Sequence, residues 1–345
     1  MGMAVSRPQN AFALFGLFFL LPVSMVSPSH VLVNFLLPVY GIGSLFYRDI
    51  DTNDETAQQW KITPDVFGIH VPAVLLSLGL QLIVGFFLWH AATRKAASPF
   101  RPALLRWEII ALFAILVMVQ NGLIWSFWRS DFRPHFSFTD PNRDLMIAAV
   151  HCGTLLLGVA VLACTSPLPE SVRIEALRAK ETRSGAIFAR SAVSLALILT
   201  VIGVMGLLTQ CLFSLADSWK VVIVAGGNLL DCFLIFSLLL EFCRLNFRRR
   251  ALGFAALWLF ILCILPFILA AVFTNASVAK YSLFSPGVLA LVFSPRSSDV
   301  LTQPGAELNS LLGIVVLHFA IAILLFLMWR REWLKLLAKA SAEQK

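Results

Sequence analysis

The chain has 345 residues, of which 59% are hydrophobic and 13% are charged, and its net charge is +8. Water-soluble domains carry roughly a quarter charged residues, so this composition excludes an ordinary soluble domain and predicts a protein whose apolar surface faces lipid. The positive charge does not indicate nucleic-acid binding, because the basic residues adjoin hydrophobic blocks, as they do on the cytoplasmic side of membranes.

Residues 1–106 are predicted to form an N-terminal membrane extension. Its apolar stretch, 11–47, is too long for one straight span and contains a Ser-Pro-Ser-His interruption, so it crosses the membrane once or twice. The run after Arg7 also resembles a signal peptide, without a clear cleavage site. The acidic gap 48–65 is expected to form an external loop before the first clean span, 72–90.

Hydrophobic blocks of about 20 residues are long enough to cross about 30 Å of hydrocarbon as helices. Seven blocks qualify: 72–90, 107–128, 145–164, 191–213, 219–242, 251–273 and 308–329. Together with 11–47 they predict an all-α, polytopic helical bundle of about eight to nine spans.

The gap before the last span contains a short apolar segment, FSPGVLALVFSP, at residues 284–295. Ser285-Pro286 forms a good helix start, and Ser294-Pro295 discourages extension. About 12 residues are too few to cross the membrane, so we expect a re-entrant or interfacial helix on the outer side.

Lysines and arginines alternate between the gaps. The gaps 91–106, 165–190 and 243–250 and the tail 330–345 hold four, five, four and five of the 27 basic residues. By the positive-inside rule these regions are cytoplasmic. We therefore expect a multi-pass protein of the cell (inner or plasma) membrane with a basic, cytoplasmic C-terminal tail.

Residues 107–329 form a six-span unit that starts from the cytoplasm. A long charged loop, 165–190, joins its second and third spans, and the short apolar helix lies outside between its fifth and sixth spans. This layout resembles the permease subunit of type-2 ATP-binding-cassette (ABC) exporters. The stretch Lys180 to Gly185 lies where that family often carries acidic and basic residues before its third span, and FGIHVPAVLLSLGLQL (67–82) is similar to stretches in some long bacterial permeases.

The resemblance implies a non-enzymatic permease that pairs as a homodimer or heterodimer in the lipid bilayer, with an ATP-binding subunit in trans. No Walker-type phosphate loop occurs in the sequence. In the family, the loop between the second and third spans contacts the ATPase. The corresponding candidates here are Arg173, Glu175, Arg178, Glu181 and Arg183. A solvated or lipid-surface helix is the alternative interpretation of this loop.

Polar residues inside the spans are the candidates for a substrate or ion path. Asp231 lies about 18 Å from the outer end of its span, with Asn228 on the same face, and His318 is at a similar depth in the last span. Together with His151, these residues form either a proton or cation site, a polar lining of a substrate path, or buried hydrogen bonds between helices.

Other polar residues favour a structural interpretation. Gln81, Gln120, Asn121 and Gln210 are expected to join helices, and Glu241 is expected to pair with Arg244. The six cysteines form no Cys-x-x-Cys pair, and His151 and His318 lack a metal-site spacing, so we expect no metal and no cofactor.

Two further functions stay open. One is an ion-coupled secondary transporter that uses Asp231 and His318, and the other is a non-transporting membrane scaffold. The substrate and the direction of transport are not indicated by any motif.

Overall fold

The computed structural model of the chain describes residues 65–97, 103–129, 140–164, 191–214, 219–247, 251–292 and 304–342. These residues are helical apart from a short hairpin and connecting turns. The elements in chain order are β1 (Asp65–Val66), β2 (Ile69–His70), α6 (Ala73–Ala97), α7 (Arg106–Arg129), α8 (Asp140–Ala163), α11 (Ala192–Ser214), α12 (Trp219–Phe247), α13 (Ala251–Cys263), α14 (Leu265–Val272), the 3₁₀ helix η5 (Ala276–Tyr281), α15 (Ser285–Val292) and α16 (Pro304–Ala342).

Each of the seven predicted spans coincides with helix. Five helical stretches among the described residues are long and apolar enough to cross a membrane. The chain is therefore a multi-pass helical membrane protein, as predicted, because in hydrocarbon a helix satisfies its own backbone hydrogen bonds. The total of eight to nine spans stays a prediction, since 11–47 and the acidic gap 48–64 lie outside the described residues.

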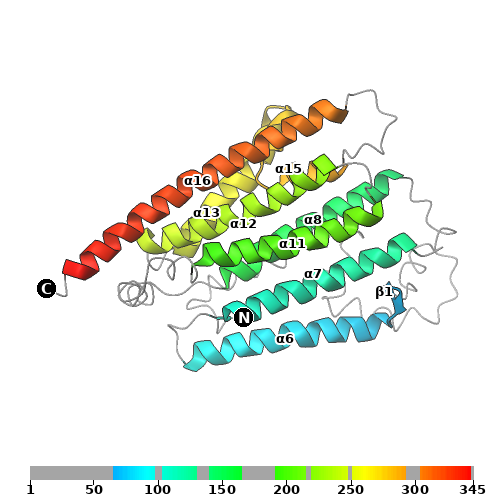
Figure 1. Cartoon of the computed structure of the whole chain (residues 1–345), viewed down its shortest axis with the longest axis horizontal. Coiled ribbons are helices and arrows are strands. Elements are labelled where there is room, and N and C mark those ends of the chain that lie inside the picture. Colours follow the sequence, from blue (N-terminus) through cyan, green and yellow to red (C-terminus); the bar gives the residue numbers. More distant parts are fainter. Residues whose placement is uncertain are drawn as a thin grey trace.

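The long helices lie side by side in a bundle (Figure 1). α6 forms one edge and packs on α7, α7 packs on α11, α11 on α12, and α12 on α16 at the opposite edge. We call the end where α6 finishes and α7 begins the basic end, because it carries Arg94, Lys95 and Arg106. The opposite end, which holds the β1–β2 hairpin, is the hairpin end.

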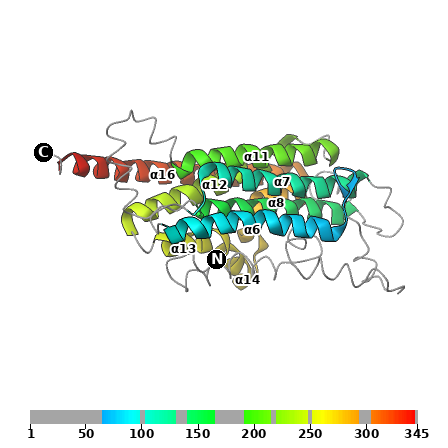
Figure 2. The ribbon, with the colours of Figure 1, turned by 90° about the horizontal axis from the view of Figure 1, so that it is seen from below.

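Among the helices that extend beyond the hydrophobic blocks that predict them, α6 and α16 extend the furthest. α6 continues to Ala97 and so includes Arg94 and Lys95, which lie in its last turn. α16 has 39 residues, about 58 Å at 1.5 Å per residue, roughly twice the hydrocarbon thickness. The predicted basic tail is therefore helical as far as Ala342, and it projects past the other helices (Figure 2).

α12 is the centre of the bundle. It packs against α8, α11, α13, α15 and α16, and most of its side chains are buried. Small residues allow close approach on two of its sides: a Cβ at Gly227 would lie 2.7 Å from Val315 of α16, and one at Gly158 of α8 would overlap the ring of Phe233. α12 and its neighbours therefore create the protein interior in which polar side chains can be buried.

Candidate functional site

The predicted span 251–273 coincides with a candidate membrane span, Gly253–Val272, but the structure interrupts it at Ile264, between α13 and α14. Pro266 is in the first turn of α14 and lacks the N–H that would bond the carbonyl of Leu262. Instead, the N–H of Leu283 donates to Leu262 O at 2.9 Å. The hydroxyl of Ser282 likewise donates to Cys263 O at 2.6 Å. The carbonyls released at the break are thus satisfied by a segment about 20 residues further along the chain.

That segment begins at Tyr281, the last residue of η5, and continues through Ser282 and Leu283, which are non-helical and fully buried. His318 Nε2 of α16 donates to the carbonyl of Tyr281 at 3.1 Å. Asn228 Nδ2 of α12 donates to the carbonyl of Leu283 at 2.5 Å. Irregular backbone at membrane depth is tolerated only where protein or a cavity satisfies it, and here two predicted site residues do so.

α15 follows directly and is the short helix predicted within 284–295. Its Ser285, Pro286, Gly287, Ala290 and Leu291 are buried, and it packs on α8, α12 and α16. The helix is thus enclosed by the bundle and does not lie on its surface.

Gly287 explains how α15 approaches so closely. A Cβ at this position would overlap His151 Nε2 and Asn228 Oδ1. These two atoms form a buried hydrogen bond between α8 and α12, in which Nε2 donates at 3.2 Å. We call the group formed by Tyr281–Leu283, Gly287, His151, Asn228 and His318, together with the Leu262 and Cys263 carbonyls, the broken-helix site.

Asp231 lies one helical turn from Asn228 on α12, so the two share a face. It is 1% exposed, and neither carboxyl oxygen has a hydrogen-bond partner among the described residues. α12 and α16 pack together, yet His318 bonds Tyr281 and not Asp231. The structure therefore brings together Asn228, His151 and His318, while Asp231 remains a separate buried carboxyl group.

The remaining polar residues of the spans mostly join helices, as predicted. Gln210 Nε2 of α11 donates to Asn121 Oδ1 of α7 at 2.6 Å, and Gln120 Nε2 donates to Val150 O of α8 at 2.7 Å. Gln81 differs, because it bonds Ser77 of its own helix. The predicted Glu241–Arg244 pair is confirmed at 3.4 Å, and Glu241 also accepts from the N–H of Ala192 at the start of α11.

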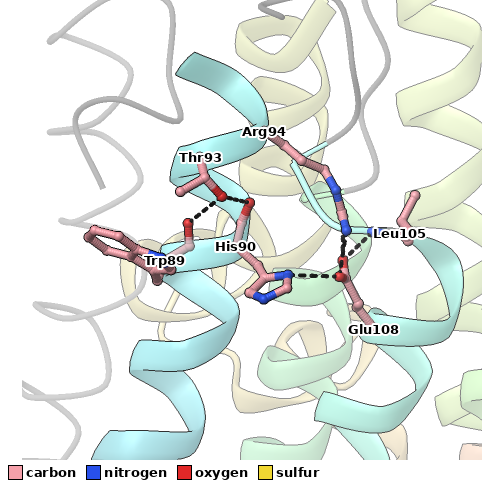
Figure 3. A network of polar contacts seen from close by, with 6 residues as sticks. All are labelled: Trp89, His90, Thr93, Arg94, Leu105 and Glu108. Carbon is pink, nitrogen blue, oxygen red and sulfur yellow. Dashed lines mark hydrogen bonds and ion pairs between the residues drawn. The ribbon is translucent and has the colours of Figure 1, made fainter. Parts of the chain in front are cut away.

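A second polar group lies at the basic end and was missed by the sequence analysis. Glu108 of α7 is 1% exposed and accepts two hydrogen bonds from the Arg94 guanidinium of α6, at 2.5 and 2.7 Å. It also accepts from the N–H of Leu105 at 2.7 Å, and His90 Nδ1 lies 3.5 Å away (Figure 3). We call Glu108, Arg94, His90 and Leu105 the α6–α7 clasp.

The clasp has a recognisable sequence signal. Glu108 is the third residue of α7 and bonds the N–H of the residue before the helix, which is one half of a capping box. Arg94 is in the last turn of the preceding helix, so a short connection brings opposite charges together. The paired arrangement is a bidentate, charge-assisted contact, and it attaches an edge helix to the bundle.

The predicted ATPase-contacting residues lie outside the described part of the chain: Arg173, Glu175, Arg178, Glu181 and Arg183. No protein-family model matches this chain, and no curated protein or solved structure is significantly similar to it. The assignment to a class therefore rests on the helices themselves, which define a multi-pass membrane protein. Its apolar interior also buries several polar side chains and the non-helical residues Ser282 and Leu283.

Proposed function

We propose that the chain is the membrane permease subunit of an ABC-type exporter, with ATP hydrolysed by a separate subunit bound in trans. One observation carries the proposal: a short, largely buried helix, α15, lies between the fifth and sixth predicted spans of the unit 107–329, which are 251–273 and 308–329. Such a segment is expected of the family that the layout of 107–329 resembles. In this proposal the basic end faces the cytoplasm of the cell membrane, and the hairpin end faces outward.

The contacts of the broken-helix site suit a subunit that changes shape. Tyr281–Leu283 is held by side chains of α12 and α16 and by two carbonyls at the end of α13, those of Leu262 and Cys263. Discontinuous helices line the substrate paths of many transporters, because their backbone groups can be satisfied in more than one arrangement. Closure of two ATPase subunits would drive paired permeases between inward-facing and outward-facing states.

The first test is co-purification followed by reconstitution. The native protein is expected to copurify with a nucleotide-binding subunit, and the double reversal Arg173→Glu/Arg178→Glu is expected to abolish permease-stimulated ATP hydrolysis and transport. The matched control, Arg330→Glu/Arg331→Glu, changes the same number of charges on exposed positions of α16 and should retain both. Robust transport by the chain alone, without an ATPase, would overturn the proposal.

Asp231 favours a second candidate, an ion-coupled carrier. A carboxyl group buried in a membrane bundle without a partner is costly as an anion, so it is suited to binding and releasing a proton or cation. Asp231→Asn keeps the size of the side chain and is expected to abolish pH-dependent uptake into liposomes without loss of folding. Absence of uptake by the wild-type chain alone excludes this candidate. Tolerance of alanine at both Asp231 and His318 would favour the non-transporting scaffold.

A further inference from the structure

A small polar cavity lies among α7, α8 and α11. Its volume is about 10 Å³, which is room for about one water molecule. Of the described residues that line it, four are polar and four are apolar or glycine: Asn121, His151, Thr154 and Gln210, and Val117, Gly203, Gly206 and Leu207. Asn121, His151, Thr154 and Gln210 are each more than nine-tenths buried.

The hydrogen bonds around the cavity determine which atoms still need partners. The Asn228 amide nitrogen donates to Leu283, so its Oδ1 is the acceptor and His151 Nε2 must carry the hydrogen. A neutral imidazole with hydrogen on Nε2 has an acceptor at Nδ1. Gln210 also lines the cavity and donates to Asn121, while its own Oε1 is buried and has no donor among the described residues.

Asn121 supplies the missing donor. Its Nδ2 carries two hydrogens, of which one bonds Val117 O at 2.8 Å. The second hydrogen is available to a molecule in the cavity. Gln210, His151 and Asn121 all line the cavity, and one oxygen atom that donates twice and accepts once has the hydrogen-bonding capacity to satisfy Gln210 Oε1, His151 Nδ1 and Asn121 Nδ2.

We propose that this cavity binds one water molecule, which donates to Gln210 Oε1 and His151 Nδ1 and accepts from Asn121 Nδ2. Three hydrogen bonds are typical of a buried water. A metal cation fits less well, because hard cations take several oxygen ligands, whereas this cavity presents an amide N–H and the described residues that line it include no carboxylate. The water joins the Gln210–Asn121 pair to His151, Asn228 and Leu283. It thereby makes one polar chain from α11 to the broken-helix site.

The direct test is a structure of the full-length protein in lipid nanodiscs, at a resolution where other buried waters are visible. The expected result is a single peak at hydrogen-bond distance from Gln210 Oε1, His151 Nδ1 and Asn121 Nδ2. An empty or collapsed cavity would overturn the proposal. So would a peak with oxygen contacts shorter than hydrogen bonds, which would identify a cation.

Nitrogen-15 histidine spectra of the same sample provide an independent readout. Wild-type His151 is expected to be neutral, with hydrogen on Nε2 and water proximity at Nδ1; hydrogen on Nδ1 instead would overturn the proposal. Gln210→Met should remove the water peak and shift the His151 Nδ1 resonance. Gln81→Met, a half-buried glutamine on α6, should leave both unchanged. An unaltered His151 Nδ1 signal in folded Gln210→Met protein would contradict the water bridge, and the two wild-type measurements decide the question if that variant does not fold.

Discussion

Two strongly apolar parts of the bundle have very different surroundings. The 18-residue apolar stretch of α12 has a mean hydropathy of 2.1, and 67% of it is buried. The corresponding stretch of Gly253–Val272, which covers most of α13 and all of α14, has a higher mean hydropathy of 2.8, and 11% of it is buried. α12 contains Asn228, Asp231, Ser237, Glu241 and Arg244, all buried; Gly253–Val272 contains no charged or amide side chain.

The difference shows that hydropathy does not identify the centre of a membrane bundle. Lipid tails are as apolar as leucine, so an apolar side chain gains little by moving from lipid to protein. A polar side chain gains more than an apolar one, because in lipid it would be exposed to hydrocarbon. The helix with buried polar residues is therefore the central one, and the most uniformly apolar helix remains at the periphery. Four pairs of variants test this contrast.

The largest difference in the free energy of unfolding is expected between the alanine variants of two phenylalanines. Phe233 of α12 is fully buried and packs edge-on against Phe113, with the two ring centroids 5.9 Å apart. Phe260 of α13, in contrast, is 44% exposed. Phe233→Ala leaves a cavity and is expected to lower the free energy of unfolding by about 3–5 kcal/mol. Phe260→Ala should cost well under about 1 kcal/mol, because lipid replaces the ring. Steric-trapping measurements in bicelles would check this, and equal losses would remove the contrast.

The second comparison concerns the ion pair between Glu108 of α7 and Arg94 of α6. Like α13, α6 is little buried, but this ion pair attaches it to the bundle. Glu108→Ala removes the acceptor of Arg94, whose side chain is 21% exposed and can partly turn to water. The expected loss is about 2–3 kcal/mol, somewhat below that for a fully buried pair. Glu332→Ala breaks a more exposed pair with Lys335 and should cost at most about 1 kcal/mol. Proteolysis or hydrogen exchange that shows no loosening of α6 in Glu108→Ala would contradict the role of the clasp.

Two glycines test whether close helix packing, like side-chain burial, differs between the centre and the periphery of the bundle. A Cβ at Gly287 of α15 would overlap His151 and Asn228, while a Cβ at Gly253 of α13 would meet nothing within 4 Å. Gly287→Ala should therefore destabilise by about 2 kcal/mol through overpacking. Gly253→Ala should stabilise by up to about 1 kcal/mol, because alanine favours helix. Thermal unfolding in nanodiscs would measure both, and a stable Gly287→Ala protein would show that α15 can move away.

The smallest difference is expected for two asparagines of α12. Asn228 bonds His151 and the carbonyl of Leu283, whereas exposed Asn246 bonds only Phe242 O of its own helix. Interhelical hydrogen bonds in membranes average about 0.6 kcal/mol each, so Asn228→Ala should cost about 1 kcal/mol and Asn246→Ala close to nothing. Steric-trapping measurements of the free energy of unfolding would compare the two variants. A smaller loss for Asn228→Ala than for Asn246→Ala would refute a central role of the broken-helix site.

Hydropathy located the helices better than their ends. The block 72–90 stops where charged residues begin, yet α6 continues through Arg94 and Lys95 to Ala97, because a helix persists into the interface after its apolar residues finish. Ser285-Pro286 correctly marks the start of the short helix α15. Pro266 carried an equally clear signal for a break, but 251–273 reads as one continuous apolar span. The helix breaks there because Leu283 and Ser282 bond the released carbonyls.

The amino-acid sequence by itself determined that the chain is a multi-pass helical membrane protein with rare polar residues at known depths, since both follow from local composition and from the need to satisfy backbone hydrogen bonds in lipid. Only the tertiary structure decided that Asn228 meets Leu283 and His151, that His318 bonds Tyr281 and leaves Asp231 apart, and that Glu108 binds Arg94. These choices depend on the rotation and packing of whole helices. Apolar faces in lipid specify that rotation weakly, so the partners of a few polar side chains and the glycines that let helices approach select one arrangement.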